Sequence, residues 1–279
     1  MTSVRWRGPG EMMTLFESFF SLTRMPFGSD LPVEELFRWQ AFNDGLAYLT
    51  MVVKYRRTGI LTGEPGTGKS TIMRTFVGGL KDNGQPVIYI AEAGLEPRAF
   101  NYLVLTALGV EPKRDRTAAK KQLKSRLMEY LDNLHPCIIL IDEAQLLAPA
   151  MLEELRLLTN ANYDSVSPVA LLLVGQTELR TRLTMSHTAA LSQRVGLRCH
   201  LNLLTNVETK DYIEHHLKMS GANRAIFTEP ACMAIHQYSH GVCRVVNNLA
   251  TTSLLIAYQD RQSLVDEGIV GRAKAALGM

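Results

Sequence analysis

The chain of 279 residues lacks any apolar run near the roughly twenty residues that a membrane-spanning helix needs. Residues 1–20 also lack the ordered basic, apolar and cleavage regions of a signal peptide. Cysteine is scarce, and no C-x-x-C pair occurs; we expect all four cysteines to be reduced core residues, namely Cys137, Cys199, Cys232 and Cys243. These absences favour a cytoplasmic protein that does not span a membrane.

A strong excess of one charge is missing as well. The net charge is +3 and the isoelectric point is near 8.6, which does not by itself indicate a nucleic-acid partner. The sequence contains no internal repeat and no low-complexity tract. The histidines considered as metal ligands show no clear metal-binding spacing: His135, His215, His216 and His240.

Short apolar segments alternate with segments of helical periodicity through most of the chain. Strands are predicted at residues 59–62, 86–91, 137–141, 169–174 and 196–201, and helices at 33–55, 71–77, 98–108, 117–134 and 151–160. This alternation predicts an α/β fold in which a parallel sheet of about five strands is covered by helices on both faces.

The pattern changes near residue 205, after which only helices are predicted, at 208–219, 229–239, 243–258 and 263–276. We therefore expect an α/β domain over residues 1–204 and an all-helical lid domain over residues 205–279. Residues 1–30 are interpreted as an N-terminal extension of the first domain, and residues 1–13 look irregular.

The most specific motif is a complete G-x-x-x-x-G-K-S phosphate-binding loop between a predicted strand and a predicted helix. Its glycines allow the backbone N–H groups to point at phosphate oxygens, and the helix N-terminus adds its dipole. We expect Lys69 to reach the β- and γ-phosphates of ATP and Ser70 to bind Mg²⁺. The predicted nucleotide contacts are Gly63, Glu64, Pro65, Gly66, Thr67, Gly68, Lys69, Ser70, Thr71 and Asp142.

Two carboxylates follow the buried strand at residues 138–141. We expect Asp142 to hold Mg²⁺ together with Ser70, and Glu143 to polarise the attacking water as general base. The next buried strand ends in Gln176, which is a candidate sensor of the γ-phosphate. We expect no metal site apart from nucleotide-bound Mg²⁺.

Three arginines are candidates for contact with the nucleotide. Arg194 and Arg198 flank the start of the last predicted strand, and either fits a finger arginine that acts on a neighbouring subunit. The sequence does not choose between them. Arg244, at the start of a helix in the lid, is a candidate for reporting the state of the γ-phosphate.

The order of these elements resembles that of an AAA+ ATPase over nearly the whole chain. More specifically, the segment F-E-S-F-F-S-L-T-R-M-P-F-G at residues 16–28 and the motifs at 61–70, 141–145, 174–179 and 191–194 resemble the ExeA family. That family includes secretion-pathway ATPases and stand-alone proteins similar to the MuB, TnsC and TniB target-selection ATPases.

The resemblance implies an ATP-driven homo-oligomer, either a ring or a helical filament. In the transposition branch such a protein coats double-stranded DNA and recruits or activates a transposase. Secretion-type members continue into a membrane span and a cell-wall-binding domain; because the sequence stops at Met279 without either, we expect the transposition branch. The alternatives are a secretion or envelope-assembly ATPase and a non-hydrolysing, nucleotide-gated adaptor.

A cluster of basic residues supports the DNA hypothesis. The segment at residues 111–126 has a local charge of +5, so the rest of the chain is slightly acidic. A basic loop and one helix face suit sequence-independent contact with phosphates, although such faces are often merely solvated. The candidate DNA contacts are Arg98, Lys113, Arg114, Arg116, Lys120, Lys121 and Lys124, and the last three are predicted to share one helix face.

Overall fold

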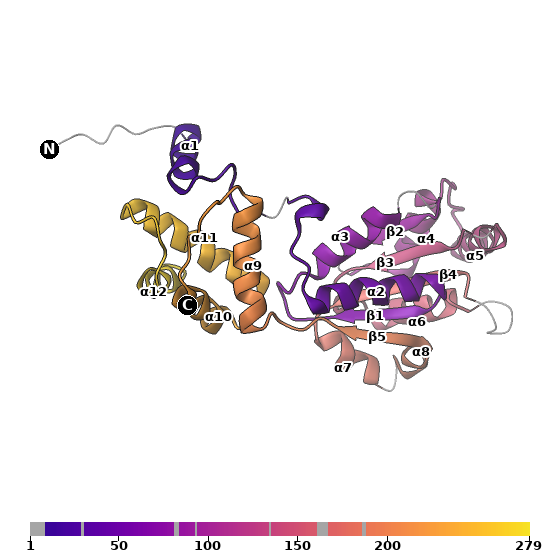
Figure 1. Ribbon diagram of the computed structural model, residues 1–279. Coiled ribbons are helices and arrows are strands. Elements are labelled where there is room, and N and C mark those ends of the chain that lie inside the picture. Colours follow the sequence, from indigo (N-terminus) through magenta and orange to yellow (C-terminus); the bar gives the residue numbers. More distant parts are fainter. Residues whose placement is uncertain are drawn as a thin grey trace. The chain divides into compact units, whose positions relative to one another are not determined.

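The computed structural model describes residues 9–28, 31–80, 84–92, 94–133, 135–160, 167–185 and 188–279. Residues 1–8 of the segment predicted to be irregular lie outside the described residues. The chain forms two compact units (Figure 1): an α/β unit of residues 40–202, and a helical unit that combines residues 203–279 with the N-terminal segment up to Trp39.

The α/β unit is built on a five-stranded sheet in which every neighbouring pair is parallel. Its strands are β1 (Thr58–Thr62), β2 (Val87–Ile90), β3 (Cys137–Ile141), β4 (Val169–Gly175) and β5 (Val195–His200), and their order across the sheet is β2-β3-β4-β1-β5. Every residue of β1, β3 and β4 is buried, which explains the continuous apolar runs. All five predicted strands and the α/β class are confirmed.

Helices precede and connect the strands of this unit. They are α2 (Gln40–Lys54), α3 (Lys69–Leu80), α4 (Pro97–Ala107), α5 (Arg116–Asp132), α6 (Pro149–Leu158), α7 (Glu178–Thr184) and α8 (Ala189–Arg194), together with the short 3₁₀ helix η2 (Ala144–Leu146). The first five match predicted segments. We did not predict α7 and α8, because seven and six residues are too few to show a helical period.

The helical unit contains α9 (Asn206–Met219), α10 (Glu229–Ser239), α11 (Cys243–Gln259) and α12 (Glu267–Ala276). Side-chain caps fix where three of them begin. Thr205 and Glu208 form a reciprocal capping box at α9, while Thr228 and Asp266 accept backbone N–H groups at α10 and α12. All four helices predicted for this region are present, and α12 begins four residues later than expected.

The described residues 9–28 and 31–39 belong to the helical unit, whereas the sequence predicts that residues 1–30 extend the α/β domain. This segment contains the 3₁₀ helix η1 (Val33–Glu35) and α1 (Pro9–Phe20), so residues 9–13 are helical and the prediction that they are irregular is wrong. The ring of Phe16 lies 5.6 Å from that of Tyr258 on α11. After α1, Thr23 donates its backbone N–H to the carbonyl of Ser220 at 2.8 Å. These contacts join residues far apart in sequence, so no local pattern indicated them.

Candidate nucleotide site

The phosphate loop lies between β1 and α3, and its glycines adopt the backbone conformation that the motif requires. Gly66 and Gly68 have φ values of 81° and 95°, in the left-handed region that favours glycine. Lys69 is 8% exposed, and its Nζ donates to the carbonyls of Gly63 at 2.8 Å and Glu64 at 2.9 Å. The lysine is therefore folded over its own loop, where its charge faces backbone oxygens.

The two carboxylates lie at the carboxyl end of β3. Asp142 is 7% exposed; its Oδ1 accepts the backbone N–H of Glu143 at 2.9 Å, and its Oδ2 accepts the phenol O–H of Tyr89 at 2.9 Å. Burial, together with this bond to the carboxylate, raises the pKa of Tyr89 to about 12. No sequence pattern indicates Tyr89, which is brought to Asp142 because β2 pairs with β3.

The exit of β4 links the two halves of the site, since β4 lies between β1 and β3. The side-chain amide of Gln176 donates to Glu143 Oε2 at 3.4 Å. The next residue, Thr177, donates its hydroxyl to Glu64 Oε1 of the phosphate loop at 2.8 Å. The sheet order therefore brings Gln176 beside the predicted base.

The residues present suit a nucleoside triphosphate with Mg²⁺. The left-handed glycines shape a loop whose N–H groups can face phosphate oxygens, and Lys69 supplies a positive charge. The exposed hydroxyl of Ser70 and the acceptor oxygens of Asp142 are hard ligands of the kind that Mg²⁺ prefers. Thr67 is buried and donates its hydroxyl to the Glu64 carbonyl at 2.9 Å, so it shapes the loop.

The candidate arginines lie in different parts of the chain. Arg194 is the last residue of α8 and is half-buried, whereas Arg198 is exposed on β5 and donates to the carbonyl and hydroxyl oxygens of Ser192 at 3.1 and 2.8 Å. Arg244 is exposed on α11 in the helical unit. The roles of all three toward the nucleotide stay predictions.

Six basic residues form an exposed surface on α4, on α5 and on the loop between them, and we call this set the basic surface. Its members are Arg98, Lys113, Arg114, Arg116, Lys121 and Lys124. Within the described part of the chain, none of them forms an ion pair with a carboxylate. Their charge is therefore available to an external partner.

Side-chain hydrogen bonds hold the loop between α4 and α5 that carries part of this surface. The phenol of Tyr102 donates to the carbonyls of Lys113 and Arg114 at 2.8 and 2.9 Å. Gln122 accepts the N–H of Lys113 at 3.1 Å and donates to the carbonyl of Glu111 at 3.0 Å. Arg98 of α4 also donates to the Arg114 carbonyl at 3.4 Å, so the loop is held by two uncharged side chains and by one guanidinium of the basic surface.

Lys120 differs from its neighbours. Its Nζ lies 2.7 Å from Oε2 of Glu154 on α6, a carboxylate that is only 7% exposed. Lys120 therefore neutralises a buried charge on α6, although 42% of its side chain stays exposed, and its contact with DNA stays a prediction. Lys121 and Lys124 are exposed.

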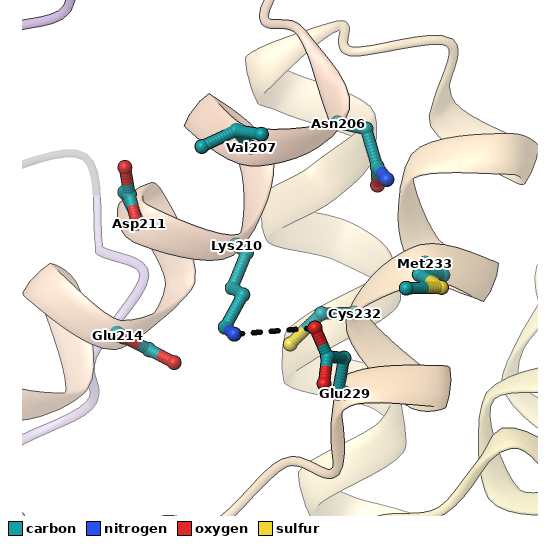
Figure 2. Close-up of a pocket in the computed structure, with 8 residues that line it drawn as sticks. All are labelled: Asn206, Val207, Lys210, Asp211, Glu214, Glu229, Cys232 and Met233. Atoms are coloured by element: carbon teal, nitrogen blue, oxygen red, sulfur yellow. Dashed lines mark hydrogen bonds and ion pairs between the residues drawn. The ribbon is translucent and has the colours of Figure 1, made fainter.

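The helical unit has a groove of about 300 Å³ between α9 and α10 (Figure 2). Lys210 and Glu229 form an ion pair across it at 3.5 Å. Its lining residues are Asn206, Val207, Lys210, Asp211, Glu214, Glu229, Cys232 and Met233. No residue that the sequence analysis placed in the nucleotide or DNA site lines this groove.

Among the residues that the structure describes, no helix combines the length and apolar character needed to cross a membrane.

The α/β unit is similar to a known protein family. Residues 52–183 match a family described as an AAA domain. This match supports ATPase activity of the α/β unit. The chain is also 30% identical over 249 residues to General secretion pathway protein A of Aeromonas hydrophila, covering 88% of this chain and 45% of that protein. It thus spans about half the length of that relative.

Solved structures share the fold at low identity. The chain resembles the Aeropyrum pernix ORC1 protein in complex with DNA with a TM-score of 0.62 and 19% identity, over 90% of this chain and 68% of the other. It resembles Drosophila ORC bound to DNA with a TM-score of 0.64 and 16% identity, over 100% and 70% of the two chains. These similarities confirm the predicted AAA+ fold.

Proposed function

We propose that this AAA+ ATPase binds double-stranded DNA through the basic surface and assembles on it as a nucleotide-dependent homo-oligomer that supports a transposase. The observation that carries the proposal is that one folded unit contains both the phosphate loop and six exposed basic side chains that have no carboxylate partner among the described residues. The DNA-bound state of the two fold relatives agrees with this reading.

The chemistry proposed for the site follows from its side chains. Bound Mg²⁺, held by Ser70 and Asp142, would offset negative charge on the phosphates. Glu143 accepts a proton from the water that attacks the γ-phosphorus, and Lys69 stabilises charge on the phosphate oxygens. Either Arg194 or Arg198 reaches a neighbouring subunit's nucleotide, so that assembly and hydrolysis are coupled.

DNA binding is tested by fluorescence anisotropy with duplex DNA across a salt series, with ATP, ADP or no nucleotide. The variant Lys121→Ala/Lys124→Ala should weaken binding and reduce the slope of log K against log [salt] by about one for each lost phosphate contact. The matched control is Lys218→Ala/Arg224→Ala, which removes two exposed charges from the helical unit. Equal slopes of log K against log [salt] for wild type and both variants would show that the basic surface does not bind DNA.

A second candidate function is an ATPase of a secretion or envelope-assembly system. It is supported by the 30% identity to General secretion pathway protein A. Membrane-protein partners recovered by co-purification, combined with no duplex-DNA binding even at low salt, would favour it. Stimulation of ATP turnover by duplex DNA would favour the transposition proposal.

A further inference from the structure

Gln145 bridges the predicted base and the predicted sensor. It lies in η2, directly after the two carboxylates of β3. Its Nε2 donates to Glu143 Oε2 at 2.5 Å, and its Oε1 accepts the backbone N–H of Gln176 at 3.0 Å. Because one end of the amide must donate and the other must accept, the side chain has a single productive orientation.

The neighbouring structure leaves room for this amide and holds its backbone. A Cβ added to Gly175 would lie 2.5 Å from Gln145 Oε1, well inside van der Waals contact, so the last residue of β4 must lack a side chain while Gln145 is in place. Arg182 of α7 donates one guanidinium N–H to the Gln145 carbonyl and another to the Leu147 carbonyl, the latter at 2.6 Å.

We propose that Gln145 is a positioning residue for ATP hydrolysis, which holds the carboxylate of Glu143 and couples it to the backbone of Gln176. The inference rests on the proposed role of Glu143 as base. In that step a water oxygen bonds to the γ-phosphorus, its proton passes to Glu143, and the bond to the bridging oxygen breaks to release ADP. Gln145 touches none of the reacting atoms.

The two carboxylate oxygens of Glu143 have different roles. Oε2 of Glu143 accepts hydrogen bonds from Gln145 and Gln176, whereas Oε1 accepts none from the described residues. Oε1 is therefore the oxygen that takes the proton. A shift of Gln176 toward or away from a γ-phosphate would move the base in two ways: through the Gln145 amide, which bonds both Glu143 and the Gln176 backbone, and through the direct bond from the Gln176 side chain.

The first test replaces Gln145 by methionine, which keeps the length of the side chain but removes both hydrogen bonds. We expect kcat to fall about tenfold or more. The loss should not exceed the roughly 10²–10⁴-fold that a general base contributes, because Gln145 acts only through that base. We expect the Kd of a fluorescent ATP analogue to stay within about threefold, because the phosphate loop is unchanged. The control is Gln262→Met, at an exposed position of the helical unit.

A double-mutant cycle separates positioning from general damage. In a Glu143→Gln background, Gln145→Met should cause no further loss of kcat, because Gln145 acts only through the base. Equal losses in both backgrounds, with a lower Tm, would overturn the inference. If Glu143→Gln alone leaves ATP turnover unchanged, Glu143 is not the base. If Glu143→Gln stops turnover but Gln145→Met does not slow it, Glu143 remains the base and only the positioning role of Gln145 is refuted.

Gly175→Ala supplies a second, independent perturbation. The added methyl group should displace Gln145 and lower kcat in the wild-type background. In a Gln145→Ala background the same substitution should cost much less, since the atom it meets at 2.5 Å is gone. Fully additive effects of Gly175→Ala and Gln145→Ala on kcat would also overturn the inference.

Discussion

Acid should weaken the helical unit through His216 on α9. This side chain is 3% exposed, and its ring centroid lies 4.2 Å from that of Tyr212 and 6.0 Å from that of Phe27. Its Nδ1 has no hydrogen-bond partner among the described residues. Burial, helped by the nearby charges of His215 and Arg24, lowers the pKa of His216 from 6.5 to about 3.

The sign and size of the effect follow from proton linkage. Between pH 6.5 and pH 3 the unfolded chain binds a proton at this histidine and the folded chain does not, so stability falls as the pH falls through that window. Between pH 7 and pH 5 the loss is about 2 kcal/mol. The figure changes little for any folded pKa below about 4, because the histidine is then neutral in the folded state at both pH values.

The assay is urea unfolding at pH 7 and pH 5, followed by the fluorescence of Trp39, which is 5% exposed in this unit. His216→Leu keeps an apolar side chain in the site and should remove about 2 kcal/mol of the pH dependence, or about 1 M in the urea midpoint. The exposed His135→Gln should keep the wild-type dependence. Equal pH dependence of wild type and His216→Leu would refute the buried, neutral histidine.

Three further outcomes are expected. Lys69→Ala should abolish the rise in Tm on adding ATP, whereas ATP at 100 times its Kd should stabilise the wild type by about 3 kcal/mol; an unchanged ATP-induced shift would contradict the role of the lysine. Lys120→Ala should destabilise the α/β unit by about 1–3 kcal/mol in chemical denaturation, because Glu154 keeps a buried charge without its cation. Gly241→Ala should cost more than about 2 kcal/mol, since its φ is 78° and the new Cβ would lie 2.0 Å from the Leu204 carbonyl oxygen; wild-type stability would contradict this packing.

Most secondary structure, the phosphate loop and the pair of carboxylates could be predicted from local sequence. A phosphate loop carries its glycines, lysine and hydroxyl within eight consecutive residues, and its placement between strand and helix fixes what they do. Buried parallel strands can also be predicted from sequence, because both of their faces are apolar and the strand is a continuous apolar run. The short helices α7 and α8 were missed because they are shorter than the pattern that identifies a helix.

The sequence by itself determined the α/β fold, the phosphate loop and the pair of carboxylates, since each of these depends on neighbouring residues along the chain. Only the tertiary structure decided which side chains meet at the strand ends. Tyr89 bonds Asp142, which is 53 positions away, and Gln145 bonds Gln176, which is 31 positions away. Lys120 pairs with the carboxylate of Glu154, 34 positions away. The order of parallel strands sets such contacts, and no spacing along the chain encodes that order.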